Sequence, residues 1–197
     1  VDRLIKSPAK QRGRDFGIIL ACLRDEGYTV EWRVINAADY GRAQRRRRGF
    51  FFVFRNDTKW GERLHTKYEA TLSNDADLNA RLDCYAPYIF EDGLFGRQFP
   101  VKNEAVKKRI NANKLDEDIA EVSANFSDGK MWNSGLMTNG YYYTIETEPK
   151  GDEEPIPMKK IVVKENQVPE DYYVDGEKLE KFKYLRGPKK ITRTAAN

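Results

Sequence analysis

The sequence holds little of the side-chain chemistry on which many enzymes depend. It has one histidine, His65, and two cysteines, Cys22 and Cys84. A Ser-His-Asp or Cys-His arrangement would have to use that one imidazole, and two distant thiols lack the spacing of a metal site. Two cysteines without a wider framework are typical of a reducing compartment. We therefore expect no bound metal, and we expect both thiols to be structural, with Cys22 in the core.

Long apolar runs and a strong net charge are missing as well. No run of about 18 apolar residues is present and the first residues show no secretory signal, so we expect no membrane span. The 35 basic and 31 acidic residues leave a net charge of +4, which excludes the uniformly basic character of a ribosomal protein. Binding of a polyanion must therefore depend on a local cluster. The length of 197 residues allows one domain and a smaller second one.

Such a cluster is present between two predicted strands, at Gln44-Arg45-Arg46-Arg47-Arg48. Because arginine keeps its charge in any protein environment, four adjacent guanidiniums cannot all be buried. If the segment is extended, Arg46 and Arg48 lie on one face and Arg45 and Arg47 on the other. Such a segment can hold one ligand on one side and a phosphate backbone on the other. This pattern indicates nucleic-acid binding.

Hydrophobic spacing predicts an α/β chain. Apolar residues recur at helical spacing over 15–27 and alternate with polar ones over 28–35, which indicates a helix and then a strand. Five consecutive apolar residues at 50–54 suit a strand that is covered on both faces. Asn139-Gly140 between apolar and aromatic residues is a strong hairpin signal. The other predicted elements are helices near 60–72, 115–124 and 176–186, a turn over 91–96 and a strand-rich region over 130–147.

Two parts of the sequence resemble bacterial DNA cytosine-5 methyltransferases. Residues 27–41 are similar to a strand and an Asn-Ala-x-Asp-Tyr-Gly turn of that family, which precede a Gln-x-Arg-x-Arg motif. In this sequence the motif falls on Gln44, Arg46 and Arg48. Residues 1–8 resemble the segment that follows the family's Glu-Asn pair. Segments 131–140 and 179–191 resemble the target-recognition domain of one branch, so the resemblance covers 1–55 and 126–193.

The resemblance implies a bacterial or phage-encoded cytoplasmic enzyme of a restriction-modification system, acting on duplex DNA. Such an enzyme flips the target cytosine out of the helix, adds a Cys thiolate to its ring and transfers a methyl group from S-adenosylmethionine to C5. Arg48 would stabilise the negative charge that forms on the base. Arg46 would lie close to the flipped nucleotide and its phosphate, and Gln44 would fix the loop. Arg45 and Arg47 would face DNA phosphate or acidic side chains of the fold.

The sequence also departs from the family pattern. The family nucleophile lies in a Pro-Cys dipeptide, and neither cysteine here follows a proline. The Gly-rich strand end that opens the S-adenosylmethionine pocket is absent, and Ala43 stands where a proline is common. We therefore predict the C-terminal portion of such an enzyme, which needs the missing N-terminal half and is inactive alone. Strands 28–35 and 50–54 would then keep open sheet edges and favour self-association.

The predicted organisation has two parts. Residues 1–55 would end a Rossmann-like methyltransferase sheet, and 56–197 would form a smaller mixed α+β target-recognition domain. Short amide and hydroxyl side chains on loops match the donors and acceptors of a DNA groove. Four residues near the hairpin are therefore candidate base readers: Asn133, Ser134, Thr138 and Asn139.

Three questions stay open from the sequence. The aromatic residues Trp132 and 141–143 either stack on bases or pack in a core, and aromatic residues in strands favour the core. The basic segment 189–193 either contacts phosphate or remains solvated. The alternatives to a methyltransferase are a catalytically inert DNA-binding module and a basic RNA-binding protein.

Overall fold

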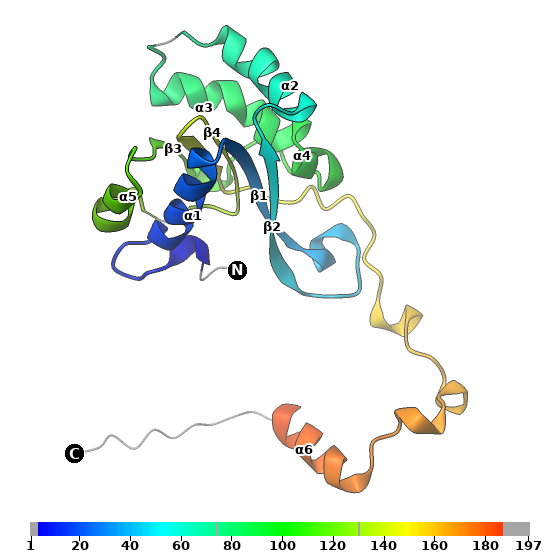
Figure 1. Ribbon diagram of the computed structural model, residues 1–197. Helices are drawn as coiled ribbons and strands as arrows, with labels where there is room; N and C mark the ends of the chain where they lie inside the picture. Colours follow the sequence, from blue (N-terminus) through cyan, green and yellow to red (C-terminus); the bar gives the residue numbers. More distant parts are fainter. Residues whose placement is uncertain (1–3, 74, 130, 187–197) are drawn as a thin grey trace, which may run out of the picture. The chain divides into compact units, whose positions relative to one another are not determined.

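The computed structural model describes residues 4–73, 75–129 and 131–186, with side chains as far as residue 183. The residues up to Ile156 form one compact unit, and the residues from Pro157 form a second. The first unit has a twisted sheet with helices on both of its faces (Figure 1). The second holds short turns of 3-10 helix and the helix α6, Gly176–Arg186. The basic segment 189–193 lies outside the described residues.

The sheet of the first unit has five antiparallel strands in the order β2-β1-β4-β5-β3. Strand β1 is paired on both sides, with β2 along its whole length and with β4 over residues 30–33. The positive φ angles of Asn139 and Gly140, 47° and 78°, make the tight turn between β4 and β5. The predicted hairpin is confirmed. The strands are β1 Tyr28–Asn36, β2 Arg47–Arg55, β3 Ile110–Lys114, β4 Ser134–Thr138 and β5 Tyr141–Ile145.

Helices cover both faces of this sheet. On one face, α1 and α5 enclose a core in which the rings of Phe16 and Trp32 meet edge to face at 5.2 Å. On the other face, α2 and α3 enclose a core in which Tyr85 stacks on Tyr143 at 4.9 Å. The helices are α1 Arg14–Asp25, α2 Lys59–Tyr68, α3 Leu78–Pro87, α4 Leu94–Gln98 and α5 Ile119–Asn125.

The predicted mixed α/β class is confirmed, with a purely antiparallel sheet. The helices predicted near 60–72 and over 176–186 are confirmed as α2 and α6, whereas α5 begins only at Ile119 and α4 occupies part of the turn predicted over 91–96. The proposed boundary at residue 55 falls within the first unit, because β1 and β4 come from opposite sides of it and pair directly. The Rossmann-like sheet and the separate recognition domain therefore stay predictions about the whole enzyme.

The prediction that both faces of strand 50–54 are covered is wrong for this chain. Phe50 and Phe51 are 46% and 43% exposed, and Phe54 is the buried residue of β2. Strand β2 is an edge strand, with no neighbouring strand on its outer side among the described residues, and the helices cover its two faces only in part. Phe16 of α1 contacts Phe51 on one face, and Trp60 of α2 contacts Phe52 on the other. The prediction of an open edge for strand 28–35 is also wrong, because β4 covers the second edge of β1.

An apolar open edge should make the isolated chain self-associate. Edge strands offer unpaired backbone groups to another chain, and β2 adds exposed phenylalanines on both of its faces. We expect sedimentation velocity to show dimers or larger species at micromolar concentrations, and Phe51→Lys to reduce them. Met158→Lys, at a 66% exposed methionine of the second unit, is the control and should change nothing. A clean monomer of the unmodified chain would contradict the prediction.

Candidate nucleic-acid interface

The basic cluster lies where β1 turns into β2. A short 3-10 helix, Ala37–Tyr40, ends β1, and Gly41 reverses the chain with a left-handed φ of 72°. Strand β2 then pairs with β1 from Arg47 onward, with Asn36 opposite Arg47 and Ile35 opposite Arg48. The arginines therefore extend in a ribbon whose side chains alternate between two sides. All residues from Gln44 to Arg48 are exposed.

The even-numbered residues of the ribbon line one pocket, which we call the even-side pocket. Gln44, Arg46 and Arg48 share this hollow of about 360 Å³. Its other walls include Phe99, the apolar Ile35 and Phe50, and two further charged residues, Arg42 and Glu153. Three guanidiniums against one carboxylate favour an anionic ligand, and the apolar surfaces suit a flat ring.

The odd-numbered residues line a second hollow, the odd-side pocket, of about 550 Å³. Arg45 and Arg47 lie in its wall together with Arg33 and Asn133. The predicted division of the four arginines between two faces is therefore confirmed. Tyr40 lines both pockets, so they lie on either side of the same short segment of chain.

Two buried charged residues of β1 hold α4 and the residue after it, which form part of the wall of the even-side pocket. Glu31, 1% exposed, accepts hydrogen bonds from the backbone N–H groups of Leu94 and Phe95, both at 2.9 Å. Burial raises the pKa of the Glu31 carboxyl, while these two hydrogen bonds and the nearby positive charge of Arg33 oppose the rise. The α4 segment is thereby fixed to the sheet.

Arg33 completes this attachment. Its side chain is 2% exposed and donates to the carbonyl oxygens of Ile89, Phe95 and Phe99. Phe99 lines the even-side pocket, and Arg33 itself lines the odd-side pocket. The same buried guanidinium therefore holds the wall of one pocket and forms part of the other.

The four candidate base readers do not share one environment. Ser134 and Thr138 are buried, and their hydroxyls bond to those of Thr147 at 2.7 Å and Thr29 at 3.1 Å. In this conformation their hydroxyls are used inside the sheet and are not offered to a base. Asn139 lies exposed on the β4–β5 turn, and its amide donates to Glu69.

Asn133 alone joins the arginine ribbon. Its amide group exchanges two hydrogen bonds of 2.8 Å with the backbone of Thr147, which fixes its orientation. It also lines the odd-side pocket beside Arg45 and Arg47.

The strand aromatic residues pack inside the protein rather than standing ready to stack on bases. Tyr142 is buried in one core and Tyr143 in the other. Trp132 is half-buried, with the Arg109 guanidinium 5.4 Å from its ring centre.

The two cysteines and the histidine line neither the even-side nor the odd-side pocket. Cys22 is exposed, so the prediction that it lies in the core is wrong; it falls on the outer side of α1. The Cys84 thiol donates to the Tyr68 carbonyl oxygen at 3.1 Å. His65 pairs with Glu69 one helical turn later. Among the described residues no cluster of His, Cys, Asp or Glu could hold a metal, and no helix is long and apolar enough to cross a membrane.

The carboxyl of Glu69 should make the stability of the fold depend on pH. Burial alone raises the pKa of its carboxyl, but hydrogen bonds from His65, Tyr85 and Asn139 together bring this pKa below the ordinary 4.5. A carboxyl whose pKa is lower in the folded state stabilises the fold above its unfolded pKa, and this contribution is lost as the pH falls. Glu69→Gln should therefore lose less stability than the unmodified chain between about pH 5 and pH 3 in urea unfolding. Glu177→Gln, exposed on α6, is the control, and equal losses in all three proteins would contradict the assignment.

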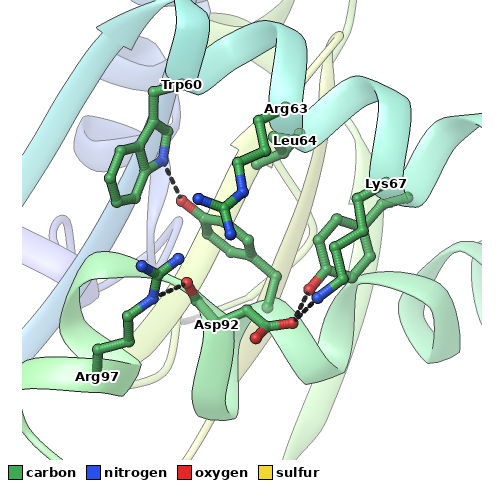
Figure 2. A pocket seen from close by; sticks show the side chains of 8 residues that line it. Trp60, Arg63, Leu64, Lys67, Asp92 and Arg97 are labelled. Atoms are coloured by element: carbon green, nitrogen blue, oxygen red, sulfur yellow. Dashed lines mark hydrogen bonds and ion pairs between the residues drawn. The ribbon is translucent and has the colours of Figure 1, made fainter.

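A third basic hollow lies between α2 and α4 (Figure 2). Asp92 accepts hydrogen bonds from Lys67 and Tyr68, and the Arg97 guanidinium lies 5.4 Å from the centre of the Trp60 ring. The hollow has a volume of only about 20 Å³, which holds no more than a water molecule. Its charged groups connect α2 with the helical turn Tyr88–Asp92 and with α4, so we assign it a structural role.

Sequence reasoning missed several residues of the two pockets. Arg42 lies only two residues before Gln44, and its charge was a usable signal. Arg33 was visible as the polar side of an alternating strand, but nothing in the pattern indicated that this side is buried. Gln98 and Phe99 come from the part of the chain in which the sequence showed no motif, and only the fold brings them to the ribbon.

Comparison with known proteins identifies the family of this chain. Residues 1–193 match the family described as C-5 cytosine-specific DNA methylase, and the chain belongs to this family. The chain is similar to the Type II methyltransferase M.Sau3AI of Staphylococcus aureus, with 43% identity over 194 residues. The match covers 98% of this chain and 42% of the relative, so the chain spans about two fifths of that protein's length. No solved structure matches the chain.

Proposed function

We propose that this chain is the portion of a DNA cytosine-5 methyltransferase that receives the flipped cytosine and contacts the surrounding DNA. The observation that carries the proposal is the even-side pocket, which is lined by Gln44, Arg46 and Arg48 and, from a distant part of the sequence, by Phe99. A cationic pocket with apolar walls suits a pyrimidine ring on an anionic backbone.

The proposed chemistry depends on charge that develops during the reaction. When a thiolate adds to the cytosine ring, electron density moves onto the base, and a cation placed beforehand stabilises it. Arg48 is proposed for this role, because an arginine keeps its charge and offers a planar set of donors. Arg46 would contact the nucleotide and its phosphate, and Gln44 would hold the loop that precedes them.

The thiolate and the methyl donor are proposed to come from elsewhere in the enzyme. Neither cysteine follows a proline; Cys84 bonds to a backbone carbonyl and Cys22 lies on α1. S-adenosylmethionine carries a sulfonium cation, which does not fit a pocket lined by three arginines and one glutamate. We therefore propose that its pocket and the Pro-Cys nucleophile lie on another segment of a cytoplasmic bacterial or phage-encoded enzyme, and that this chain alone transfers no methyl group.

Complementation tests the proposal. The chain is mixed with a polypeptide that supplies the Pro-Cys half, and transfer of labelled methyl groups to duplex DNA is measured. Activity that requires both pieces supports the proposal. Binding of duplex DNA without any methyl transfer would favour the inert DNA-binding module, and tighter binding of single-stranded RNA would favour the RNA-binding protein. Either result would overturn the proposal.

A further inference from the structure

The odd-side pocket has the composition of an anion site. Its wall holds three guanidiniums, those of Arg33, Arg45 and Arg47, and one carboxylate, that of Asp39. The Asp39 carboxylate already accepts a hydrogen bond of 2.9 Å from the Asn36 amide. Arg45 forms no ion pair within the described residues, so it is not neutralised by an acidic side chain of the fold. Guanidiniums in such excess match the oxygens of a phosphate.

This pocket is built into the fold, because one of its arginines is buried. Arg33 is 2% exposed, and its terminal nitrogens are fixed by three backbone carbonyl oxygens. Its Nε has no hydrogen-bond partner among the described residues. A fixed guanidinium loses little conformational freedom when it receives a ligand, unlike a mobile surface lysine. Asn133 is held just as firmly in the same wall by Thr147.

The two pockets lie on opposite sides of one ribbon. Tyr40 lines both, and adjacent residues from Gln44 to Arg48 point alternately into one and the other. A nucleotide in the even-side pocket remains joined to its neighbours through phosphodiesters, so the DNA strand must continue past the edge of the ribbon. We propose that the odd-side pocket binds a backbone phosphodiester close to the extruded nucleotide, through Arg33, Arg45 and Arg47. This inference rests on the proposed function and adds a second binding site to it.

The salt dependence of DNA binding tests this site. The test variant of the full chain is Arg45→Gln/Arg47→Gln, which leaves the buried Arg33 in place. The control is Arg12→Gln/Arg63→Gln, which removes the same charge from two exposed arginines elsewhere. One lost phosphate contact should reduce the slope of log affinity against log salt by about 0.9, or roughly eightfold in affinity at about 0.1 M salt. The control should keep the original slope, and equal slopes for both variants would overturn the proposal.

A second experiment distinguishes DNA from free phosphate. Neutral methylphosphonate linkages are placed one at a time along a duplex. We expect one position to weaken binding by the unmodified chain roughly eightfold and to have no effect on the test variant. Titration of inorganic phosphate without DNA is the other arm. Saturable phosphate binding that the test variant loses, combined with an unchanged DNA slope, would assign the pocket to a free anion and overturn the proposal.

The failure of this inference is distinguishable from failure of the proposed function. Methyl transfer by the complemented enzyme with an unchanged salt slope in the test variant would remove only the phosphate site. A reduced slope without methyl transfer by any mixture would remove the methyltransferase function and leave a phosphate site in a DNA-binding module.

Discussion

Replacing Arg48 with alanine should lower methyl transfer by the complemented enzyme about 10²–10³-fold, the usual effect of removing one donor that stabilises developing charge. The loss should appear in kcat more than in DNA affinity, because the negative charge on the base exists only during the reaction. Arg48 is the second residue of β2 and lines the even-side pocket beside Gln44 and Arg46. Single-turnover transfer of labelled methyl groups at saturating DNA measures the effect.

Two further variants sharpen this test. Arg48→Lys keeps the charge without the planar donors, so it should recover part of the rate. Arg12→Ala removes an exposed arginine from the loop before α1 and should leave the rate unchanged. If Arg48→Ala instead weakens DNA binding and leaves the rate of the bound complex intact, then Arg48 is an ordinary phosphate contact.

Replacing Arg33 with methionine should lower the free energy of unfolding by about 3–5 kcal/mol, which is the effect of breaking a buried charged arrangement. The change removes one donor from each of three carbonyl oxygens, those of Ile89, Phe95 and Phe99. The Phe95 oxygen keeps the Phe99 N–H and the Phe99 oxygen keeps the Tyr40 hydroxyl. It also removes the positive charge that opposes the raised pKa of the buried Glu31 carboxyl. Urea unfolding followed by tryptophan fluorescence measures the change.

Arg109 provides the comparison for Arg33. It forms an ion pair with Glu146 at 2.5 Å, but 41% of its side chain is exposed. Exposed pairs contribute about 0–1 kcal/mol, so Arg109→Met should change stability little. Similar losses of unfolding free energy in Arg33→Met and Arg109→Met would mean that the buried position of Arg33 adds nothing to its contribution to stability. If Arg33→Met prevents folding altogether, Arg33→Lys replaces it, with a smaller expected loss because one ammonium can still donate to some of the carbonyls.

The parts of the fold that the sequence predicted are those that depend on local patterns. Asn139-Gly140 predicted the hairpin correctly, because both residues adopt positive φ angles, which asparagine and glycine tolerate. The helix predicted near 60–72 corresponds to α2. Strand β3 escaped prediction because Ile110-Asn-Ala-Asn-Lys alternates over only four residues and consists, after its first residue, of Asn, Ala and Lys, which are depleted in strands. Its pairing with β5 places it in the sheet.

In the candidate site, too, the sequence predicted only the features that depend on a local pattern. The alternation of Arg45 to Arg48 follows from the two-residue period of an extended chain, so the sequence was enough to divide them between two sides. The burial of Ser134 and Thr138 was not accessible in this way. A hydroxyl-bearing residue near a turn gives the same sequence pattern whether its side chain is exposed to water or packed inside the sheet. Only the pairing of β4 with β1 and β5 decides that these two side chains are buried.

The sequence by itself determined the family and the identity and alternation of the arginines, because motif and strand period are local properties of the chain. The tertiary structure decided which walls face those arginines. Buried Arg33 and Glu31 hold α4 from a site more than fifty residues away, and no local pattern encodes a contact of that range. Burial and long-range pairing depend on how strands and helices pack together, so both pockets exist only in the folded chain.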